Sequence, residues 1–342
     1  MKKTRCVIII GMKYLIVSHR ADLDGVASAV LMTQAVPEEH RMNAHVAFAD
    51  YDDKLPLLSG VVDTFKPDVV WIGDLAFRIN EFDDVYALLK DVGEVKFYDH
   101  HVSSSEFFDR VRESWPQACV SLDVSGDFCT ADLVYNDNPD AMTSEWMEEL
   151  RSATHSADLF LNINRNGTLL SMVITVLGAN ATFDMILADP SCICEEKFTG
   201  VMQACVEKCR RQDQKSFDLA NWSEHSMLVT SLPGSPKIVL CFTAGNESVI
   251  GNGMAERHSP AWTIMLKPDI NAVSMRTNQQ TIDMTGISVA DIAASFGGGG
   301  HPRAAGFDLP LPWLIKGMDF ALVELADRIR SIHAEKQLAL AN

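Results

Sequence analysis

Short apolar runs alternate with helix-like segments along the first half of this chain, and this alternation constrains the fold more than any other feature of the sequence. The runs have the length and composition of buried strands, and the segments between them carry apolar residues at helical spacing. Such a series predicts βαβ units with a parallel sheet covered on both faces. The expected strands are residues 14–18, 44–49, 68–73 and 94–98, and the expected helices are residues 26–35 and 80–90.

The loop SHRADLDG follows the first expected strand and holds His19, Asp22 and Asp24. In sheets of this kind ligands bind beyond the carboxyl ends of the strands, so these polar residues lie where a site is expected. Imidazole and carboxylate together favour Mn²⁺, Zn²⁺, Co²⁺ or Fe²⁺ over Ca²⁺, which prefers oxygen ligands alone. A polar loop with an aspartate that caps the following helix is the structural alternative.

Acidic and imidazole side chains also follow two later strands. Asp74 comes directly after VVWIG, Asp99, His100 and His101 come after VKFY, and Asp158 follows a later expected helix. Three strand ends therefore bring such groups to one edge of the sheet. Carboxylates this densely placed repel one another unless cations lie between them, so the cluster predicts a metal centre.

Asp50, Asp52 and Asp53 follow another expected strand and compete for the same role. Their surroundings, FADYDDKL, are typical of a solvated acidic loop, so we interpret them as surface residues. Ligation by this run stays open as the lesser alternative.

The second half of the chain begins with a polar, charged helical stretch at residues 195–219, which we interpret as a connector. With roughly 150 residues per domain as a guide, the length of the chain predicts about two domains. After the connector, strands are expected at residues 237–242, 262–266 and 272–275, then a short helix at 289–296 and one long helix at 313–340. The expected boundaries are 1–190 for the first domain, 191–222 for the helical connector and 223–342 for the second domain.

The segment GGGGHPRAAGF in the second domain is the other motif with a chemical interpretation. Consecutive glycines let backbone N–H groups approach an anion closely, and the Gly-Lys-Ser/Thr of a P-loop does not follow. An arginine fork suits a phosphate, because it can donate two hydrogen bonds at once. A flexible loop is the alternative. The candidate substrate-binding residues are Gly297, Gly298, Gly299, Gly300, His301 and Arg303, with Arg276 on the strand before them.

The ordered set of motifs resembles the DHH phosphoesterase family, which includes nanoRNases (oligoribonuclease-like enzymes) and RecJ-related nucleases. The glycine segment resembles the signature of the family's associated C-terminal domain, and the strand around Arg276 resembles the arginine-bearing strand before it. Together the matches span residues 14–307. The four catalytic motifs of the family are matched here by His19-x-x-Asp22-x-Asp24, by Asp74, by Asp99-His100-His101 and by Asp158.

The resemblance implies an α/β fold, in which a doubly wound, mostly parallel N-terminal sheet is followed by a smaller α/β domain with a mixed sheet and the active site lies in the cleft between them. It also implies two divalent metal ions, most often Mn²⁺. Two ions about 3.5 to 4 Å apart can activate a hydroxide and stabilise charge on a pentacovalent phosphoryl group. His101 would contact the substrate phosphate or donate a proton, and Asp99 would orient the histidines. The resemblance assigns His19 and Asp22 to one ion, Asp24 and His100 to the other, and Asp74 and Asp158 to positions that bridge or flank both.

The charge balance limits the substrate. The chain has 29 Lys and Arg against 46 Asp and Glu, which gives a formal net charge of −17. Phosphate neutralisation supplies most of the affinity of proteins that coat long nucleic acids, so such a role is not expected. The basic cluster of the related soluble pyrophosphatases is not found either. A short oligonucleotide or a phosphorylated nucleotide, held at one local positive site, is the expected partner.

Eight cysteines are too few for a disulfide scaffold in a chain of this length, so reduced thiols and a cytoplasmic location are expected. Cys192, Cys194, Cys205 and Cys209 are clustered, but their spacing matches no common zinc knuckle, and buried core thiols are the favoured interpretation. No apolar run approaches the roughly 18 to 20 residues of a membrane span. A homodimer stays open.

These observations predict a metal-dependent phosphoric ester hydrolase, a phosphodiesterase or phosphatase, that acts on short oligonucleotides or on nucleotide esters such as 3′-phosphoadenosine 5′-phosphate. The enzymatic alternatives are a RecJ-like single-strand exonuclease and a cyclic or linear dinucleotide phosphodiesterase. A nucleotide sensor without catalysis is the alternative from another class, although every expected ligand position carries a ligand-type residue. The loop reads Leu23-Asp24 where many relatives have Gly-Asp, which leaves the subfamily open.

Overall fold

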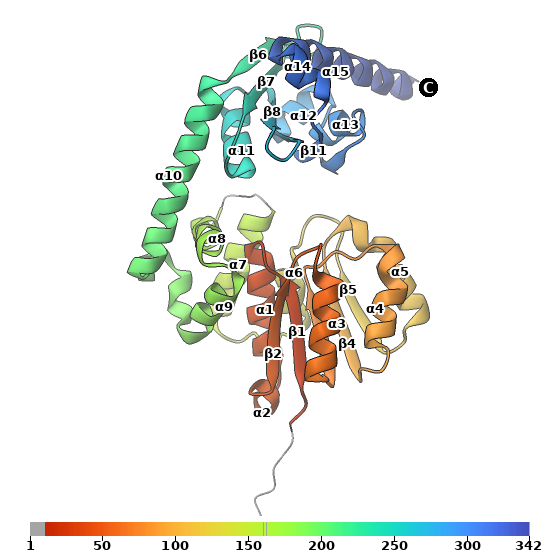
Figure 1. The fold of residues 1–342 in the computed structure, drawn as a ribbon, viewed down its shortest axis with the longest axis vertical. Helices are drawn as coiled ribbons and strands as arrows, with labels where there is room; N and C mark the ends of the chain where they lie inside the picture. Colours follow the sequence, from red (N-terminus) through yellow and green to blue (C-terminus); the bar gives the residue numbers. More distant parts are fainter. Residues whose placement is uncertain (1–10, 160, 162, 342) are drawn as a thin grey trace, which may run out of the picture. The chain divides into compact units, whose positions relative to one another are not determined.

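The computed structural model describes residues 11–159, 161 and 163–341. The chain divides into two compact units between Cys209 and Arg210. This division falls inside helix α10 (Gly200–Trp222), which runs from the first unit into the second (Figure 1). Each unit has its own sheet and its own hydrophobic core.

The first unit contains a five-stranded parallel sheet with the order β2-β1-β3-β4-β5. Four of its strands lie at the expected places. The fifth, β5, was not expected, because its sequence ACVSL is only partly buried at the sheet edge and has no continuous apolar run. The strands are β1 (Tyr14–His19), β2 (Ala44–Ala49), β3 (Val69–Gly73), β4 (Glu94–Asp99) and β5 (Ala118–Leu122).

Helices cover both faces of this sheet (Figure 1). Successive strand residues point to opposite faces, so Leu15 and Val17 enter one core and Tyr14 and Ile16 enter the other. One core is closed by α3 (Lys54–Phe65), α4 (Phe82–Leu89) and α5 (Ser105–Ser114). The other is closed by α1 (Leu23–Ala35), α6 (Thr130–Asp137), α7 (Glu145–Asp158), α8 (Arg165–Leu177) and α9 (Ala179–Ala188), while the short α2 (Glu38–Arg41) precedes β2.

The turn from β1 into α1 is tight. The Asp22 carboxylate accepts a hydrogen bond from the N–H of Gly25 at 3.0 Å and so caps the helix. A Cβ atom on Gly25 would lie 2.1 Å from the carbonyl oxygen of His19, so only glycine fits there. The helix start therefore lies directly against the end of β1, close to the expected site.

The second unit contains a six-stranded mixed sheet with the order β10-β11-β9-β8-β7-β6. Only β7 and β8 pair in parallel; the other neighbours are antiparallel. The strands are β6 (His225–Leu228), β7 (Lys237–Phe242), β8 (Ala261–Lys267), β9 (Ala272–Thr277), β10 (Gly299–His301) and β11 (Ala304–Asp308).

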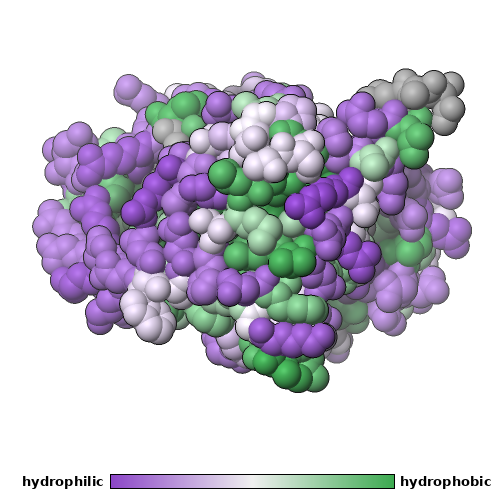
Figure 2. Space-filling view, turned by 90° about the horizontal axis from the view of Figure 1, so that it is seen from above, coloured by the Kyte–Doolittle hydropathy of each residue, from purple (hydrophilic) through white to green (hydrophobic). Residues whose placement is uncertain are grey.

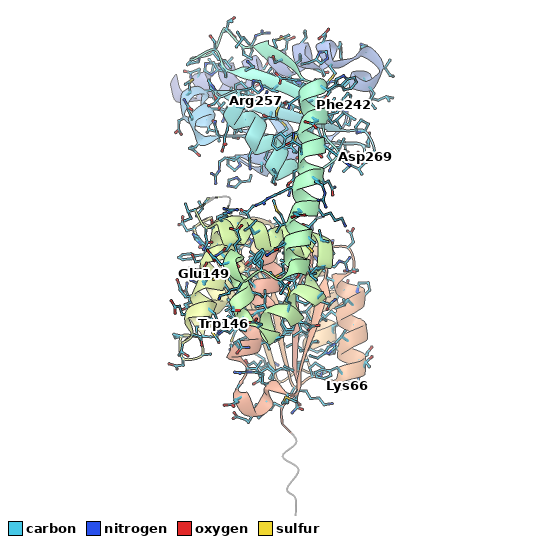
Figure 3. All side chains as sticks on the ribbon, turned by 90° about the vertical axis from the view of Figure 1, so that its left-hand side faces the viewer. Lys66, Trp146, Glu149, Phe242, Arg257 and Asp269 are labelled. Atoms are coloured by element: carbon cyan, nitrogen blue, oxygen red, sulfur yellow. The ribbon has the colours of Figure 1, made fainter. Side chains whose placement is uncertain are left out.

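Helices also cover the two faces of the mixed sheet. Val239 and Met265 face α11 (Glu247–Arg257), whereas Ile238 and Ile264 face α13 (Val289–Ala294) and α15 (Met318–Ala341). Arg257 (Figure 3), the last residue of α11, donates a hydrogen bond to the side chain of Asn221 in α10. Figure 2 shows the molecule from above relative to Figure 1, and this face is largely hydrophilic with an apolar area near its centre. The remaining helices of this unit are α12 (Gln279–Thr285) and α14 (Leu311–Lys316).

Two expectations for the helices were wrong. The final helix is not continuous over residues 313–340, because Gly317, with φ of 88°, separates α14 from α15. The connector helix begins at Gly200 rather than near residue 195, since two 3₁₀ turns, Pro190–Ile193 and Glu195–Lys197, come before it. In both cases helical spacing continues across a position where the backbone departs from the α-helix.

Substituting Gly317 with alanine should destabilise the protein, because a residue with Cβ is strained at φ of 88° and ψ of 175° by roughly 1 to 3 kcal/mol. Gly60→Ala is the matched control, since Gly60 lies inside α3 with open space around it, and alanine there should stabilise by about 0.5 to 1 kcal/mol. Thermal unfolding measures both changes. An unchanged or raised Tm for Gly317→Ala would contradict the break between the two helices.

Candidate active site

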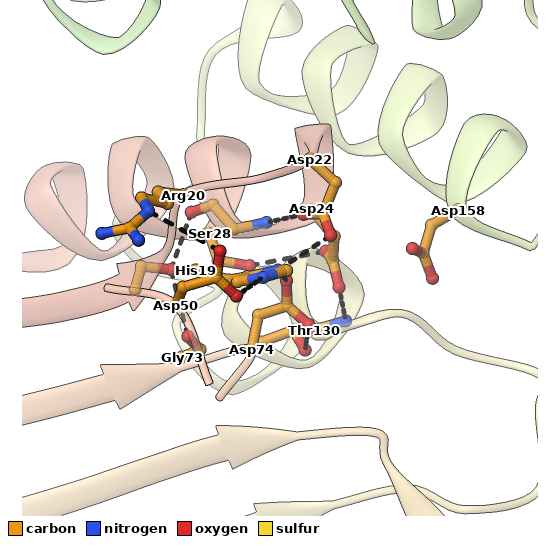
Figure 4. A network of polar contacts seen from close by, with 12 residues as sticks. His19, Arg20, Asp22, Asp24, Ser28, Asp50, Gly73, Asp74, Thr130 and Asp158 are labelled. Atoms are coloured by element: carbon orange, nitrogen blue, oxygen red, sulfur yellow. Dashed lines mark hydrogen bonds and ion pairs between the residues drawn. The ribbon is translucent and has the colours of Figure 1, made fainter. Parts of the chain in front are cut away.

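Three neighbouring strands of the parallel sheet bring expected site residues to one edge. His19 is the last residue of β1, Asp74 directly follows β3, and His100 directly follows β4. The strand order reverses between β1 and β3, which is the place where open α/β sheets bind ligands. Figure 4 shows the side chains of His19 and Asp74 facing each other at this edge.

His19 lies between two carboxylates. Its Nδ1 atom is 2.8 Å from Oδ2 of Asp22 and 3.6 Å from Oδ2 of Asp74. His19 and Asp74 are buried, yet neither ring nitrogen of His19 nor Oδ2 of Asp74 has a hydrogen bond of normal geometry. Buried polar atoms without such a bond are rare, so the three side chains are suited to hold a cation.

A second group surrounds His100. Its Nε2 atom is 3.7 Å from Oδ2 of Asp24, 3.6 Å from Oδ1 of Asp74 and 3.7 Å from Oδ2 of Asp158. Two ligand atoms each about 2.1 Å from one ion, at a tetrahedral angle, are about 3.4 Å apart, so these separations suit a shared ion. Asp158 is the last residue of α7 and approaches from a different helix than Asp24 (Figure 4).

Asp74 belongs to both groups, because Oδ2 faces His19 and Oδ1 faces His100. Its φ of 58° is in the left-handed region, which aspartate tolerates better than most residues. The N–H of Asp74 donates to the carbonyl of Tyr98 in the neighbouring strand at 3.0 Å. The chain therefore bends directly after β3 and leaves one carboxylate between two imidazoles.

The Asp24 carboxylate is held by the N-terminus of α6. The backbone N–H groups of Thr130 and Ala131 donate to Oδ2 and Oδ1 of Asp24, both at 2.8 Å. The positive end of a helix dipole favours such a buried negative charge. Sequence reasoning missed these donors. The available signal was the CTAD pattern of a helix start, which gives no indication of the distant carboxylate that it faces.

The close carboxylates shift the ionisation of one another. Burial and the charges of Asp74 and Asp158 raise the pKa of Asp24 well above its usual range. Burial also raises the pKa of Asp158 to about 7, with a further contribution from Asp74. The carboxylates cannot all be ionised at neutral pH unless positive charge lies among them.

The same carboxylates raise the pKa values of the neighbouring imidazoles. Burial lowers the pKa of His19, but Asp22 and Asp74 outweigh it and raise the pKa to about 11. For His100, Asp74 and Asp24 overcome burial in the same way and raise the pKa to about 10. The carboxylates of the cluster thus strongly stabilise positive charge among them, and either protons or metal cations can provide it.

His101 lies beside His100 and Asp74, with which it forms another possible metal-binding group, and it has two further partners. Its Nδ1 atom is 2.7 Å from Oδ1 of the buried Asp99, and its Nε2 atom is 3.1 Å from the phenol oxygen of Tyr51. The ring of Tyr51 also lies 4.7 Å from the ring of His19, centroid to centroid. Tyr51 was missed from the sequence, because it lies in the acidic run that we interpreted as surface.

That acidic run is partly at the site. Oδ1 of Asp50 is 3.5 Å from Nε2 of His19, and Arg20 pairs with Asp50 and Asp53 at 3.6 and 2.5 Å. Asp52 is exposed. Residues 50–53 form the turn between β2 and α3, and Asp53 lies directly before the helix.

A groove of about 590 Å³ lies over the edge of the second sheet, and its lining includes Arg276 and the four consecutive glycines Gly297–Gly300. The Nε atom of Arg276 is buried without a hydrogen-bond partner, while its other nitrogens donate to the hydroxyls of Ser274 and Ser248. The glycines do not form a free loop. Gly299 and Gly300 belong to β10, and a Cβ on Gly298 would lie 2.1 Å from the carbonyl oxygen of Gly306.

His301 and Arg303 are not among the residues that line this groove. His301 is exposed at the end of β10, and its Nδ1 atom accepts a hydrogen bond from the backbone N–H of Arg303 at 3.2 Å. The structure therefore brings Arg276 and the glycines together and places the other two candidates on the turn beside them.

Four groups of His, Cys, Asp and Glu side chains within the described residues are close enough together that they could hold a metal ion, and Cys192, Cys194, Cys205 and Cys209 belong to none of them. Three of these cysteines are buried and Cys194 is half-buried.

None of the described helices has the length and hydropathy needed to cross a membrane.

Comparison with known proteins identifies the fold. No protein-family profile matches the chain, and no curated protein is similar to it in sequence. A pGpG-specific phosphodiesterase from Vibrio cholerae superposes with a TM-score of 0.54 and 15% identity over 93% of this chain and 99% of that chain. An exopolyphosphatase-related protein from Bacteroides fragilis superposes with a TM-score of 0.51 and 14% identity over 94% of each chain. The expected α/β fold, with a parallel sheet followed by a mixed sheet, is confirmed.

The stability of the metal-free protein should fall as the pH rises from about 4 to about 8. Asp24 and Asp158 keep their protons to higher pH in the folded state than in the unfolded chain, where the pKa of aspartate is about 3.9. The folded state thus binds more protons in this window, and stability is lost as they dissociate. His19 and His100 act in the same direction above about pH 6.5.

Thermal unfolding in EDTA and in excess Mn²⁺ across this pH range measures the effect. We expect the difference in Tm between the two series to widen toward high pH, because cations then replace the lost protons. Asp158→Asn should flatten the EDTA series, whereas Asp140→Asn, at an exposed carboxylate, should not. Parallel EDTA and Mn²⁺ series would contradict the electrostatic argument.

Proposed function

We propose that this chain, which has the fold of the DHH phosphoesterases, is a cytoplasmic, metal-dependent phosphoesterase that hydrolyses short oligonucleotides or nucleotide phosphate esters. The observation that supports this most is the Asp74 carboxylate, whose two oxygens face His19 and His100 at the switch point of the sheet. A carboxylate between two such groups suits a pair of cations, and paired cations are typical of phosphoester hydrolysis.

The proposed cofactors are two divalent ions, and the mixture of imidazole and carboxylate ligands favours Mn²⁺. The orphaned nitrogens of His19 and the unbonded oxygen of Asp74 fit this assignment. When bound, the ions supply positive charge that activates water and offsets the charge of the phosphoryl oxygens. We assign His19 and Asp22 to one ion, Asp24, His100 and Asp158 to the other, and Asp74 to both.

We propose that His101 acts on the substrate phosphate. Asp99 holds Nδ1 and so fixes the ring, which leaves Nε2 as the atom that can donate a proton to the leaving oxygen. Burial lowers the pKa of His101, but Asp99 outweighs it and raises the pKa, which favours the protonated form. Nε2 points toward the phenol oxygen of Tyr51, which is 3.1 Å away.

We propose that the groove of the second unit binds the far end of the substrate. The buried, unpartnered Nε of Arg276 and the backbone of the glycine segment are suited to a phosphate. Glu247 and Asp308 also line the groove, and Lys267 pairs with Glu247, so the positive charge is local. Such a site suits one terminal phosphate better than a continuous strand.

A substrate panel tests this function directly. The purified protein with Mn²⁺ is assayed on pGpG, on 3′-phosphoadenosine 5′-phosphate, on a cyclic dinucleotide and on a long single strand. The phosphodiesterase with a similar fold is named for pGpG, which makes this linear dinucleotide the first one to test. We expect turnover of at least one short substrate, and turnover of none of the four would refute the proposal.

Asp74→Asn and the triple change of Asp99, His100 and His101 to alanine should abolish hydrolysis, because each removes groups that hold the cations. The expected loss is at least about 1,000-fold in kcat/KM, or about 4 kcal/mol. EDTA should inactivate the native protein and Mn²⁺ should restore it. Asp140→Asn controls for the loss of one exposed carboxylate. Native turnover by Asp74→Asn would exclude the assigned role of this residue.

Arg276→Ala should raise KM for a short substrate more than it lowers kcat, because a contact to the far end is equally strong in the ground and transition states. Arg330→Ala, at an exposed arginine of α15 in the same unit, is the control and should change neither constant. The comparison is made by steady-state kinetics at physiological salt on pGpG and on a long strand. A higher kcat/KM on the long strand would favour the RecJ-like alternative instead.

A further inference from the structure

We propose that Asp132 is a positioning residue for the metal centre, through which α6 and α7 hold Asp24 and Asp158 at the separation that one shared ion requires. This inference rests on the proposed function. Asp132 lies outside the set of expected ligands and does not touch them directly.

Asp132 is fully buried, and its carboxylate accepts three hydrogen bonds. Its carboxylate accepts from the backbone N–H of Cys129 at 2.9 Å, from Nη1 of Arg151 at 2.7 Å and from Nδ1 of His155 at 2.7 Å. A buried charge is costly, and a carboxylate with this many donors is retained where it fixes geometry. The partners come from the start of α6 and from α7, so Asp132 joins these two elements.

The link to Asp24 runs through the first turn of α6. Cys129 is the N-cap residue of this helix, and its N–H is held by Asp132 from within the same turn. The next two N–H groups, of Thr130 and Ala131, donate to the Asp24 carboxylate. The hydrogen bond of Asp132 therefore fixes the turn whose free N–H groups hold Asp24.

The link to Asp158 runs through the last turns of α7. Arg151 and His155 lie on this helix, and Asp158 follows His155 by three positions, one helical turn away. Glu149, also on α7 (Figure 3), fixes the helix to the following segment, because its carboxylate accepts hydrogen bonds from the side chains of Asn164 and Asn166. Asp132 thus anchors the end of α7 that carries Asp158 to the helix that holds Asp24.

A third metal ion is the competing explanation, because Cys129, Asp132 and His155 also lie within 4.8 Å of one another. The guanidinium of Arg151 occupies one oxygen of Asp132, and a cation beside it would meet a like charge. Burial also raises the pKa of the Cys129 thiol well above its usual range, so the thiolate needed for ligation is disfavoured. A structural network explains the three side chains better than a metal.

The test is a Mn²⁺ titration of the full chain by calorimetry, with stoichiometry and affinity for each site. In Asp132→Asn we expect one of the two sites to weaken by roughly 10- to 100-fold, as for other residues that orient metal ligands, and the second site to change little. At limiting Mn²⁺ kcat should fall, at saturating Mn²⁺ it should recover, and KM for the dinucleotide should stay unchanged. Asp137→Asn, an exposed residue at the end of the same helix, is the matched control.

His155→Gln is the second variant and keeps the test decisive if Asp132→Asn does not fold. It removes the imidazole and keeps a side-chain donor, so the same site should weaken by a smaller factor. Two native affinities in a folded variant, even with a lower Tm, would overturn the positioning role. If the native protein binds no Mn²⁺, the proposed function itself fails, which is a different result.

Discussion

The first unit depends on one electrostatic constraint: several carboxylates lie buried at one edge of a sheet, within a few ångströms of one another. Like charges at such distances cannot persist in a medium of low polarity unless positive charge lies among them. Protons on the imidazoles of His19 and His100, or metal cations that these residues hold as neutral ligands, can supply it. The backbone N–H groups at the start of α6 add a further favourable interaction beside Asp24.

The parallel sheet meets this constraint through backbone geometry. The bend at Asp74 lets one carboxylate face two imidazoles, and the start of α6 offers two N–H groups to Asp24. Neither the bend at Asp74 nor the N–H groups of α6 requires a further charged side chain at the site. The charged side chains that the fold does use, Asp132 and Arg151, lie one layer further out and orient the helices. Asp132 and Arg151 therefore support the cluster without lying in it.

Much of this could be predicted from the sequence because it is encoded locally. Each central strand is a continuous apolar run, and the polar residue that ends it reaches the sheet edge whatever the rest of the chain does. Asp74 and His100 could be placed in this way without any structure. The pairing of the glycine segment with β11 could not, because glycine runs are typical of loops and the register depends on a distant strand.

The missed parts share a different physical cause. Thr130 and Ala131 act through their backbone N–H groups, which any residue type supplies, so no pattern of side chains points to them. Tyr51 and Asp50 lie in a run whose charge is typical of surface, and their approach to His19 depends on how α3 packs. The break at Gly317 is also not local, because the same spacing of apolar residues fits one helix or two.

The net charge of −17 and the groove around Arg276 both affect how many phosphates a ligand of this protein can carry. Charges on a protein surface act over roughly 10 Å at moderate ionic strength, so the phosphates of a strand that extends beyond one local site meet acidic surface. Each further phosphate then adds repulsion instead of counterion release. The groove is lined by Arg276 and Lys267 but also by Glu247 and Asp308, and Lys267 pairs with Glu247, so it offers a phosphate little more than the Arg276 guanidinium. If the chain hydrolyses phosphate esters as proposed, the net negative charge of the protein disfavours a ligand with many phosphates.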